Sequence, residues 1–129
     1  MTVTSAEAFA LSQWFRDLSI ELGNYRTKEW NNLSESQRQS FEDAEWKLLN
    51  AANEFTTAAV GLTLDESEAS LGKLKECTEQ AKEAVKTLQT VRKAINVATA
   101  AVGLAAAILS KDLGAIGKNA KSLYDAAHG

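Results

Sequence analysis

The segment SESQRQSFEDAEWKLLNAANEFTTAAVGL, residues 34–62, determines the fold class of this chain. It opens with Ser34 and Gln37, the spacing at which two side chains cap a helix N-terminus reciprocally. Large apolar residues then recur every seven positions, and alanines lie three positions after the first three of them: Phe41, Leu48, Phe55 and Leu62, with Ala44, Ala51 and Ala58. This pattern predicts a helix over about 35–62, with a seam that lets another helix approach closely.

A second long helix is predicted directly after the first. Asp65 and Glu68 have the spacing of another N-terminal cap, and only Thr63 and Leu64 separate them from the preceding pattern. Heptad-like apolar positions follow: Leu71, Leu74, Ala81, Val85, Leu88, Val91 and Ile95. Because so short a connection reverses the chain, we expect helices of about 35–62 and 66–93 to form a long antiparallel hairpin.

The segment AINVATAAVGLAAAILS, residues 94–110, contains no charged residue. Its apolar side chains lie all round a helix, so it has no polar face. The pattern leaves open whether this alanine-rich helix continues the preceding one. A C-terminal amphipathic helix is then predicted, with one apolar side: Leu113, Ile116, Ala120, Leu123 and Ala127.

An N-terminal helix precedes this hairpin. Thr4 and Glu7 have the spacing of a capping box, and one apolar stripe follows: Leu11, Phe15, Leu18, Leu22 and Tyr25. Its end is open, either at Gly23-Asn24 or near Trp30. Proline is absent from the 129 residues, and no strand alternation is found. We therefore expect residues 1–129 to form a single all-α domain, an antiparallel bundle of four to five helices built around the hairpin.

The composition argues against an enzyme. The one histidine, His128, is the penultimate residue, and the one cysteine, Cys77, is expected on the charged side of its helix among carboxylates that raise its pKa. Glu42 and Glu45 have a spacing found in di-iron bundles, but no histidine follows them. We expect no catalytic residue, no cofactor, no metal site and no small-molecule substrate. Binding of a small apolar ligand between helices is a third, weaker hypothesis.

Tryptophans mark the candidate contacts for a protein partner. Trp46 lies off the seam of its helix, so it either packs against the first helix, with Trp14 or Trp30 as neighbours, or forms an exposed aromatic hot spot. In the second case the contact residues would be Trp30 and Trp46 with the acidic Glu42 and Asp43. Residues 1–65 carry a net charge of −5 and residues 66–129 of +2. No basic stripe is strong enough to indicate a nucleic-acid partner.

The charge-free segment 94–110 has three interpretations. It is a central helix covered on every side, a homo-oligomer interface, or a membrane-inserting segment flanked by Arg92, Lys93 and Lys111. In the last two cases its large apolar residues would make the contact: Val97, Val102, Leu104, Ile108 and Leu109. An amphipathic hairpin that shelters such a segment resembles α-helical pore-forming proteins, in arrangement alone.

The functional prediction is a non-enzymatic helical bundle that binds another protein or itself. The alternative is a membrane-active, pore-forming-like protein that inserts segment 94–110. The N-terminal sequence Met1-Thr2-Val3-Thr4 lacks the basic region of a signal peptide, and an unpaired cysteine suits a reducing compartment. A cytoplasmic location is therefore expected, while secretion by a non-classical route stays open.

Overall fold

The computed structural model describes residues 2–64, 70–87 and 90–128. Within them lie five α-helices and a short 3-10 turn at Trp30–Asn32. The helices are α1 (Ser5–Lys28), α2 (Glu35–Ala58), α3 (Leu71–Thr87), α4 (Val91–Ser110) and α5 (Leu113–His128). They pack against each other, and the only β-type pairing in the described part of the chain is an isolated bridge between Thr2 and Thr63. The predicted all-α bundle of up to five helices is confirmed.

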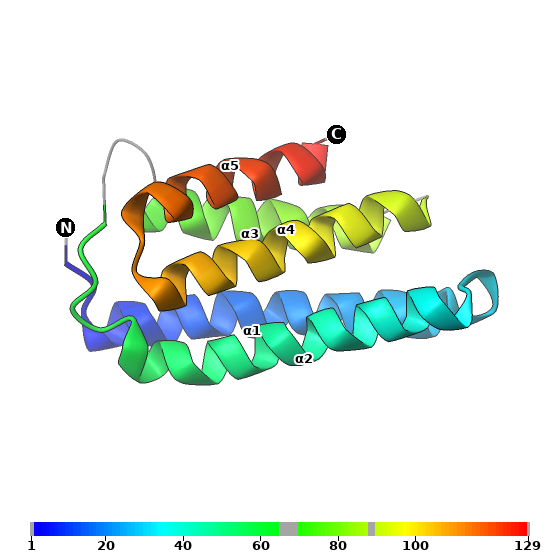
Figure 1. The fold of residues 1–129 in the computed structure, drawn as a ribbon, viewed down its shortest axis with the longest axis horizontal. Helices are drawn as coiled ribbons and strands as arrows, with labels where there is room; N and C mark the ends of the chain where they lie inside the picture. The colour runs from blue at the N-terminus through cyan, green and yellow to red at the C-terminus, as the bar shows by residue number, and fades with distance from the viewer. Residues whose placement is uncertain (1, 65–69, 88–89, 129) are drawn as a thin grey trace.

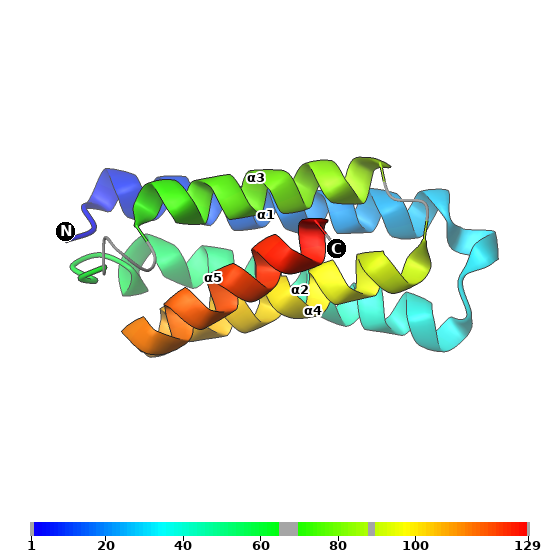
Figure 2. The same cartoon turned by 90° about the horizontal axis from the view of Figure 1, so that it is seen from above.

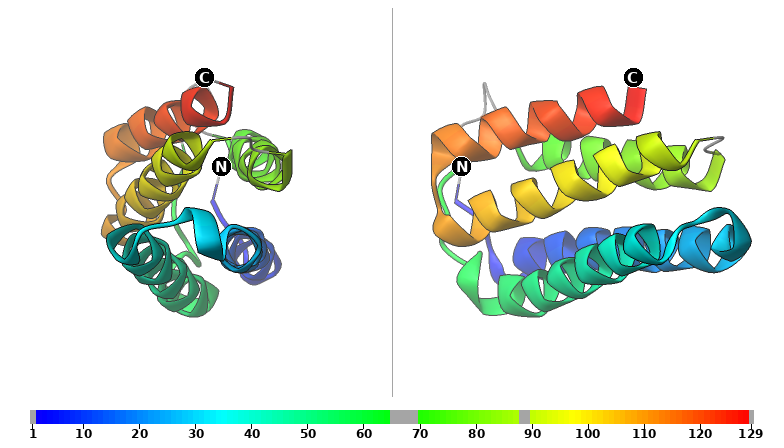
Figure 3. Two further views of the ribbon diagram at one scale, coloured as in Figure 1. Left: turned by 90° about the vertical axis from the view of Figure 1, so that its right-hand side faces the viewer. Right: turned by 45° about the vertical axis from the view of Figure 1, so that its right-hand side comes forward.

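The helices alternate in direction along the chain, as the colour gradient in Figure 1 shows. Helices α1, α3 and α5 therefore begin at the same end of the molecule, where α2 and α4 finish. Helices α1 and α2 lie side by side, α3 packs on α1, and α4 packs on α2. Helix α5 covers both α3 and α4, so the end-on view in Figure 3 shows a closed ring in the order α2, α1, α3, α5, α4.

Two of the predicted helix caps are confirmed. The Thr4 hydroxyl accepts from the Glu7 N–H at 3.2 Å, and the Glu7 carboxylate accepts from the Thr4 N–H at 3.0 Å. Ser34 and Gln37 make the same reciprocal pair. The cap predicted at 65 and 68 lies outside the described residues. The described helix α3 begins at Leu71, preceded by Ser70, whose hydroxyl accepts from the Lys73 N–H at 3.1 Å.

The predicted pairing of the second helix is wrong. The neighbours of α2 in the bundle are α1 and α4, while α3 packs against α1 and α5. Helix α2 ends at Ala58 rather than near 62, and Gly61 then adopts a left-handed φ of 81°. There the N-terminal segment is held by two backbone bonds, from Val3 N–H to Leu62 O and from Gly61 N–H to Val3 O, both 2.8 Å. The heptad stripe identified which face of α2 is buried, but not the helix that covers it.

The helix predicted over 66–93 is in fact divided. Helix α3 ends at Thr87, and α4 starts at Val91, three residues before the expected charge-free segment. Thr90 has extended backbone angles (φ −126°, ψ 138°), and its hydroxyl accepts from the Lys93 N–H as an N-cap. The open end of α1 is also resolved, because that helix runs through Gly23 to Lys28.

The core lies along the axis of the ring. Phe15 of α1 and Phe55 of α2 meet edge to face, with ring centroids 5.2 Å apart, and Tyr25 and Phe41 form a second aromatic pair at 5.5 Å. The predicted seam of α2 is buried at Phe41, Leu48, Phe55, Ala44 and Ala51, whereas Ala58 is only partly buried. Sequence periodicity therefore identified the inward side of α2 correctly.

Candidate functional site

The most exposed large apolar side chains of the described chain lie on the α1–α2 pair. Trp46 of α2 is 63% exposed, and Phe9 and Ile20 of α1 are 57% and 54% exposed. All three point away from the core stripe of their own helix. We call these three residues, together with Arg16 and Asn53, the outer face.

Two polar contacts across the α1–α2 pair fix where these residues lie. Arg16 Nη2 donates to Asn53 Oδ1 at 2.8 Å, and further along Arg26 pairs with Glu45 and Glu42. Ile20 lies one helical turn after Arg16, and Trp46 one turn after Glu42. Because the helices are antiparallel, Ile20 and Trp46 both lie between the two contacts. The centre of the outer face, at Ile20 and Trp46, is therefore shared by both helices, whereas Phe9 lies about three turns before Ile20 on α1.

Gly23 of α1 leaves room for the Glu45 carboxylate of α2. A Cβ atom at Gly23 would lie 2.8 Å from Glu45 Oε1, so a larger residue would displace that carboxylate. Glu45 accepts from Arg26 Nε at 2.8 Å, and its backbone carbonyl accepts from the Ser19 hydroxyl at 2.9 Å. The hydrogen bond to Glu45 raises the pKa of Arg26, so the Arg26 guanidinium stays charged in this partly buried contact. These contacts link α1 to α2 in the region where Ile20 and Trp46 lie.

The structure separates the predicted contact residues. Trp30 is half-exposed at the turn between α1 and α2, with the Arg38 guanidinium 4.3 Å from its ring centre, whereas Trp46 lies three turns into α2. Glu42 is tied to Arg26 at 3.5 Å, and Asp43 accepts from Gln39 Nε2 at 3.0 Å. Of the four candidates, only Trp46 belongs to the outer face.

The expectation that Trp46 packs against another tryptophan is wrong. Trp14 instead lies partly buried against the core and lines a groove between α1 and α3. Sequence reasoning missed Phe9 and Ile20 as surface residues. The signal was present, because both are large apolar residues outside the stripe that runs through Leu11.

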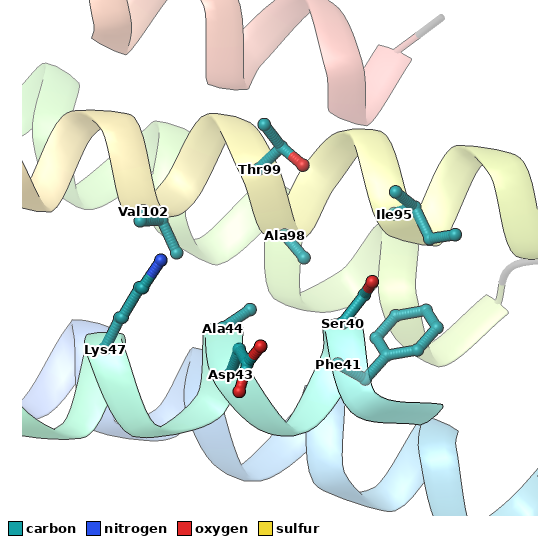
Figure 4. Close-up of a pocket in the computed structure, with 9 residues that line it drawn as sticks. All are labelled: Ser40, Phe41, Asp43, Ala44, Lys47, Ile95, Ala98, Thr99 and Val102. Carbon is teal, nitrogen blue, oxygen red and sulfur yellow. The ribbon is translucent and has the colours of Figure 1, made fainter. Parts of the chain in front are cut away.

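A small cavity of about 250 Å³ lies on the other flank of α2, against α4. Figure 4 shows Ala44 and Ala98 facing each other there, between the ring of Phe41 and the side chain of Lys47. Asp43 lines its edge. The hollow arises because two alanines meet where the helices cross, so its floor is apolar and its polar groups lie at the rim.

Helix α4 is covered on part of its circumference. Val97, Leu104 and Ile108 are buried, whereas Val102 and Leu109 are only partly buried. Its remaining side is exposed: Arg92, Asn96, Thr99, Ala106 and Ser110. The interpretation of a helix covered on every side is therefore wrong. By length and composition α4 passes the test for a membrane-spanning helix, with mean hydropathy 1.6, although core helices of soluble proteins pass it too.

Cys77 is buried rather than on the charged side of its helix. It is 3% exposed, its Sγ donates to the Leu74 carbonyl at 3.3 Å, and burial raises the pKa of its thiol to about 12. A group with so high a pKa stays protonated at neutral pH. No cluster of three or more His, Cys, Asp or Glu side chains that could hold a metal ion occurs in the part of the chain that the structure describes.

Comparison of the chain with family models, with curated proteins and with solved structures found no match. Function is therefore inferred from the surface of the molecule itself.

Proposed function

We propose that the protein binds another protein, or a second copy of itself, through the outer face. The supporting observation is the 63% exposure of Trp46 beside exposed Ile20, on a support braced by the Arg26–Glu45 pair. Tryptophan and arginine are enriched among the residues that dominate binding energy at protein interfaces. Two neighbouring helices also offer the groove into which a partner's amphipathic helix can pack.

The composition of the outer face suits an interface. Its centre is aromatic and aliphatic, while Asn53 beside it is neutral and Arg16 is already bonded within the pair. Interface centres are depleted in charged residues in the same way. Covering Trp46 would remove its exposed 63% from water, and a buried tryptophan at the centre of an interface contributes about 2 kcal/mol or more to binding.

Replacing both Ile20 and Trp46 with serine is expected to abolish association while leaving the fold intact. Both side chains are mostly in solvent, so helix content by circular dichroism should be unchanged. Size-exclusion chromatography with light scattering tests self-association over a range of concentrations. A photo-crosslinking residue at position 46, introduced in the native host, captures any other protein partner.

Two controls make this test specific. Leu113→Ser removes an exposed apolar residue of α5 and should leave association unchanged. A crosslinker at Lys75, which is exposed on α3, should not capture the same partner. The proposal would be refuted if the protein is a monomer by light scattering and a crosslinker at position 46 captures no more protein than one at position 75.

A second candidate function, membrane insertion of α4, has the hydropathy of that helix in its favour. Thr99 lies at the middle of α4 and is exposed in the bundle, so Thr99→Lys should fold normally. In a bilayer, however, the same lysine would cost about 2.5–3.5 kcal/mol, reducing insertion roughly a hundredfold.

Co-flotation with anionic liposomes measures this effect. Thr57→Lys, an equal charge change on the exposed side of α2, is the matched control. If α4 inserts, the unmodified protein and Thr57→Lys should float with the liposomes and Thr99→Lys should not. Absence of flotation of the unmodified protein, or equal flotation of both variants, would eliminate this candidate.

A further inference from the structure

A second surface feature lies far from the outer face, between α3 and α5. These helices are neighbours and run in the same direction (Figure 2). A cavity of about 550 Å³ opens between them, within the range of roughly 300–1,000 Å³ that is usual for sites holding small molecules. It is more than twice the volume of the hollow between α2 and α4.

The floor of this α3–α5 groove is apolar because its residues are small or uncharged. Gly114, Gly117 and Ala120 of α5 face it, and Cys77 of α3 lies at its base. The buried Cys77 thiol is protonated, since its pKa is about 12, and therefore contributes no charge. A Cβ atom at Gly114 would meet only Asp112 Oδ1, at 3.6 Å, so the space above this glycine is open.

The rim of the groove carries two neighbouring cationic side chains on α5, Lys118 and Lys121. Lys73 and Glu76 line it from α3, and the Asp112 carboxylate approaches its floor at Gly114. An apolar floor with ammonium groups at its edge is complementary to a molecule with an apolar chain and one anionic head. A hydrophilic polyanion would leave the floor without apolar contacts.

Aromatic and polar contacts link α5 to α3 at one end of the groove. Tyr124, which also lines the groove, packs against His128 with ring centroids 4.3 Å apart. The His128 ring in turn hydrogen-bonds the Gln80 side chain of α3. These contacts join α5 to α3 next to the cavity, whose volume of about 550 Å³ suits a short chain.

We propose that the α3–α5 groove binds an amphipathic carboxylate, a medium-length acyl chain lying on the Cys77–Gly117 floor with its carboxylate held by Lys118 and Lys121. This site is separate from the outer face and does not depend on protein binding there. The same acyl chemistry could reach the groove from free fatty acid or from a membrane lipid. We commit to the free acid, because a cavity of about 550 Å³ has the size of sites that hold a single small molecule.

The test uses decanoate and its uncharged analogue decanol, titrated into the full chain by isothermal calorimetry. Decanoate should bind saturably at one site, and more tightly than decanol. The double variant Lys118→Gln/Lys121→Gln should weaken decanoate about tenfold or more and change decanol little, since only the carboxylate bonds to these lysines. Lys75→Gln is the control: it removes the charge of an exposed lysine of α3 that does not line the groove. It should leave the affinities for decanoate and decanol unchanged.

A second variant tests the floor without relying on charge. Gly114→Leu projects a side chain into open space and so should fold, yet it should weaken decanoate and decanol alike. Circular dichroism of each variant verifies the fold. No saturable decanoate binding, equal binding of decanoate and decanol, unchanged affinity in the lysine variant, or binding only to anionic vesicles would each overturn the proposal.

Discussion

Replacement of Phe15 by alanine is expected to lower the free energy of unfolding by about 3–5 kcal/mol. Phe15 is fully buried on α1 and meets the Phe55 ring of α2 edge to face at 5.2 Å. Its removal loses the transfer energy of the ring and leaves a cavity beside the Phe55 ring. Because whole domains are stable by about 5–15 kcal/mol, this single change should remove a large part of the total.

Urea denaturation followed by circular dichroism measures this loss. Phe9→Ala is a matched control, since it changes the same residue type on the same helix at an exposed position. It should alter stability by no more than about 0.5 kcal/mol. Comparable losses in the two variants would show that the assignment of inward and outward sides of α1 is wrong.

The other large effect is expected for Leu104→Lys in the middle of α4. Leu104 is fully buried, so the variant removes an apolar side chain and places an ammonium group away from water. Losing the leucine alone costs about 2–5 kcal/mol, and burying an unpaired charge adds to this. We expect the variant to be largely unfolded at room temperature, with lost helix signal in circular dichroism.

Two further substitutions make this result interpretable. Leu104→Ala should remain folded with a measurable loss of about 2–5 kcal/mol in urea denaturation. Thr99→Lys places the same charge on the exposed side of the same helix and should retain near-normal stability. A stable, fully helical Leu104→Lys protein would show that α4 does not face the core at this position.

Local signals in the sequence were sufficient to predict several helix starts and the buried side of α2. Thr4 with Glu7, and Ser34 with Gln37, form the capping boxes that their spacing predicts, because such caps depend on residues three positions apart. Phe41, Leu48 and Phe55 lie on one buried side of α2 because their seven-residue spacing, a local property, puts them on the same side of a helix. The break between α3 and α4 was not predicted, although the Thr90 N-cap that marks it is also a local feature. The apolar stripe continues through Val91, and this continuity predicts one unbroken helix.

Long-range features were not predictable in this way. A stripe shows which side of α2 is buried, but α1, α3 or α4 could each have covered it, and the choice depends on the whole packing arrangement. The candidate surfaces depend on the same information. Trp46 was expected to pack against another tryptophan and is exposed, whereas Cys77 was expected among charges and is buried at the base of the α3–α5 groove. Both outcomes follow from the positions of neighbouring helices.

The five alternating helices of residues 2–64, 70–87 and 90–128 leave the helix dipoles unbalanced. Each helix carries a macrodipole equivalent to about half a positive charge at its N-terminus and half a negative charge at its C-terminus. Because α1, α3 and α5 begin at one end and only α2 and α4 begin at the other, two antiparallel pairs cancel and about one helix macrodipole remains. The end at which α1, α3 and α5 begin therefore carries an excess of partial positive charge, which acts on groups close to the first turns of these helices.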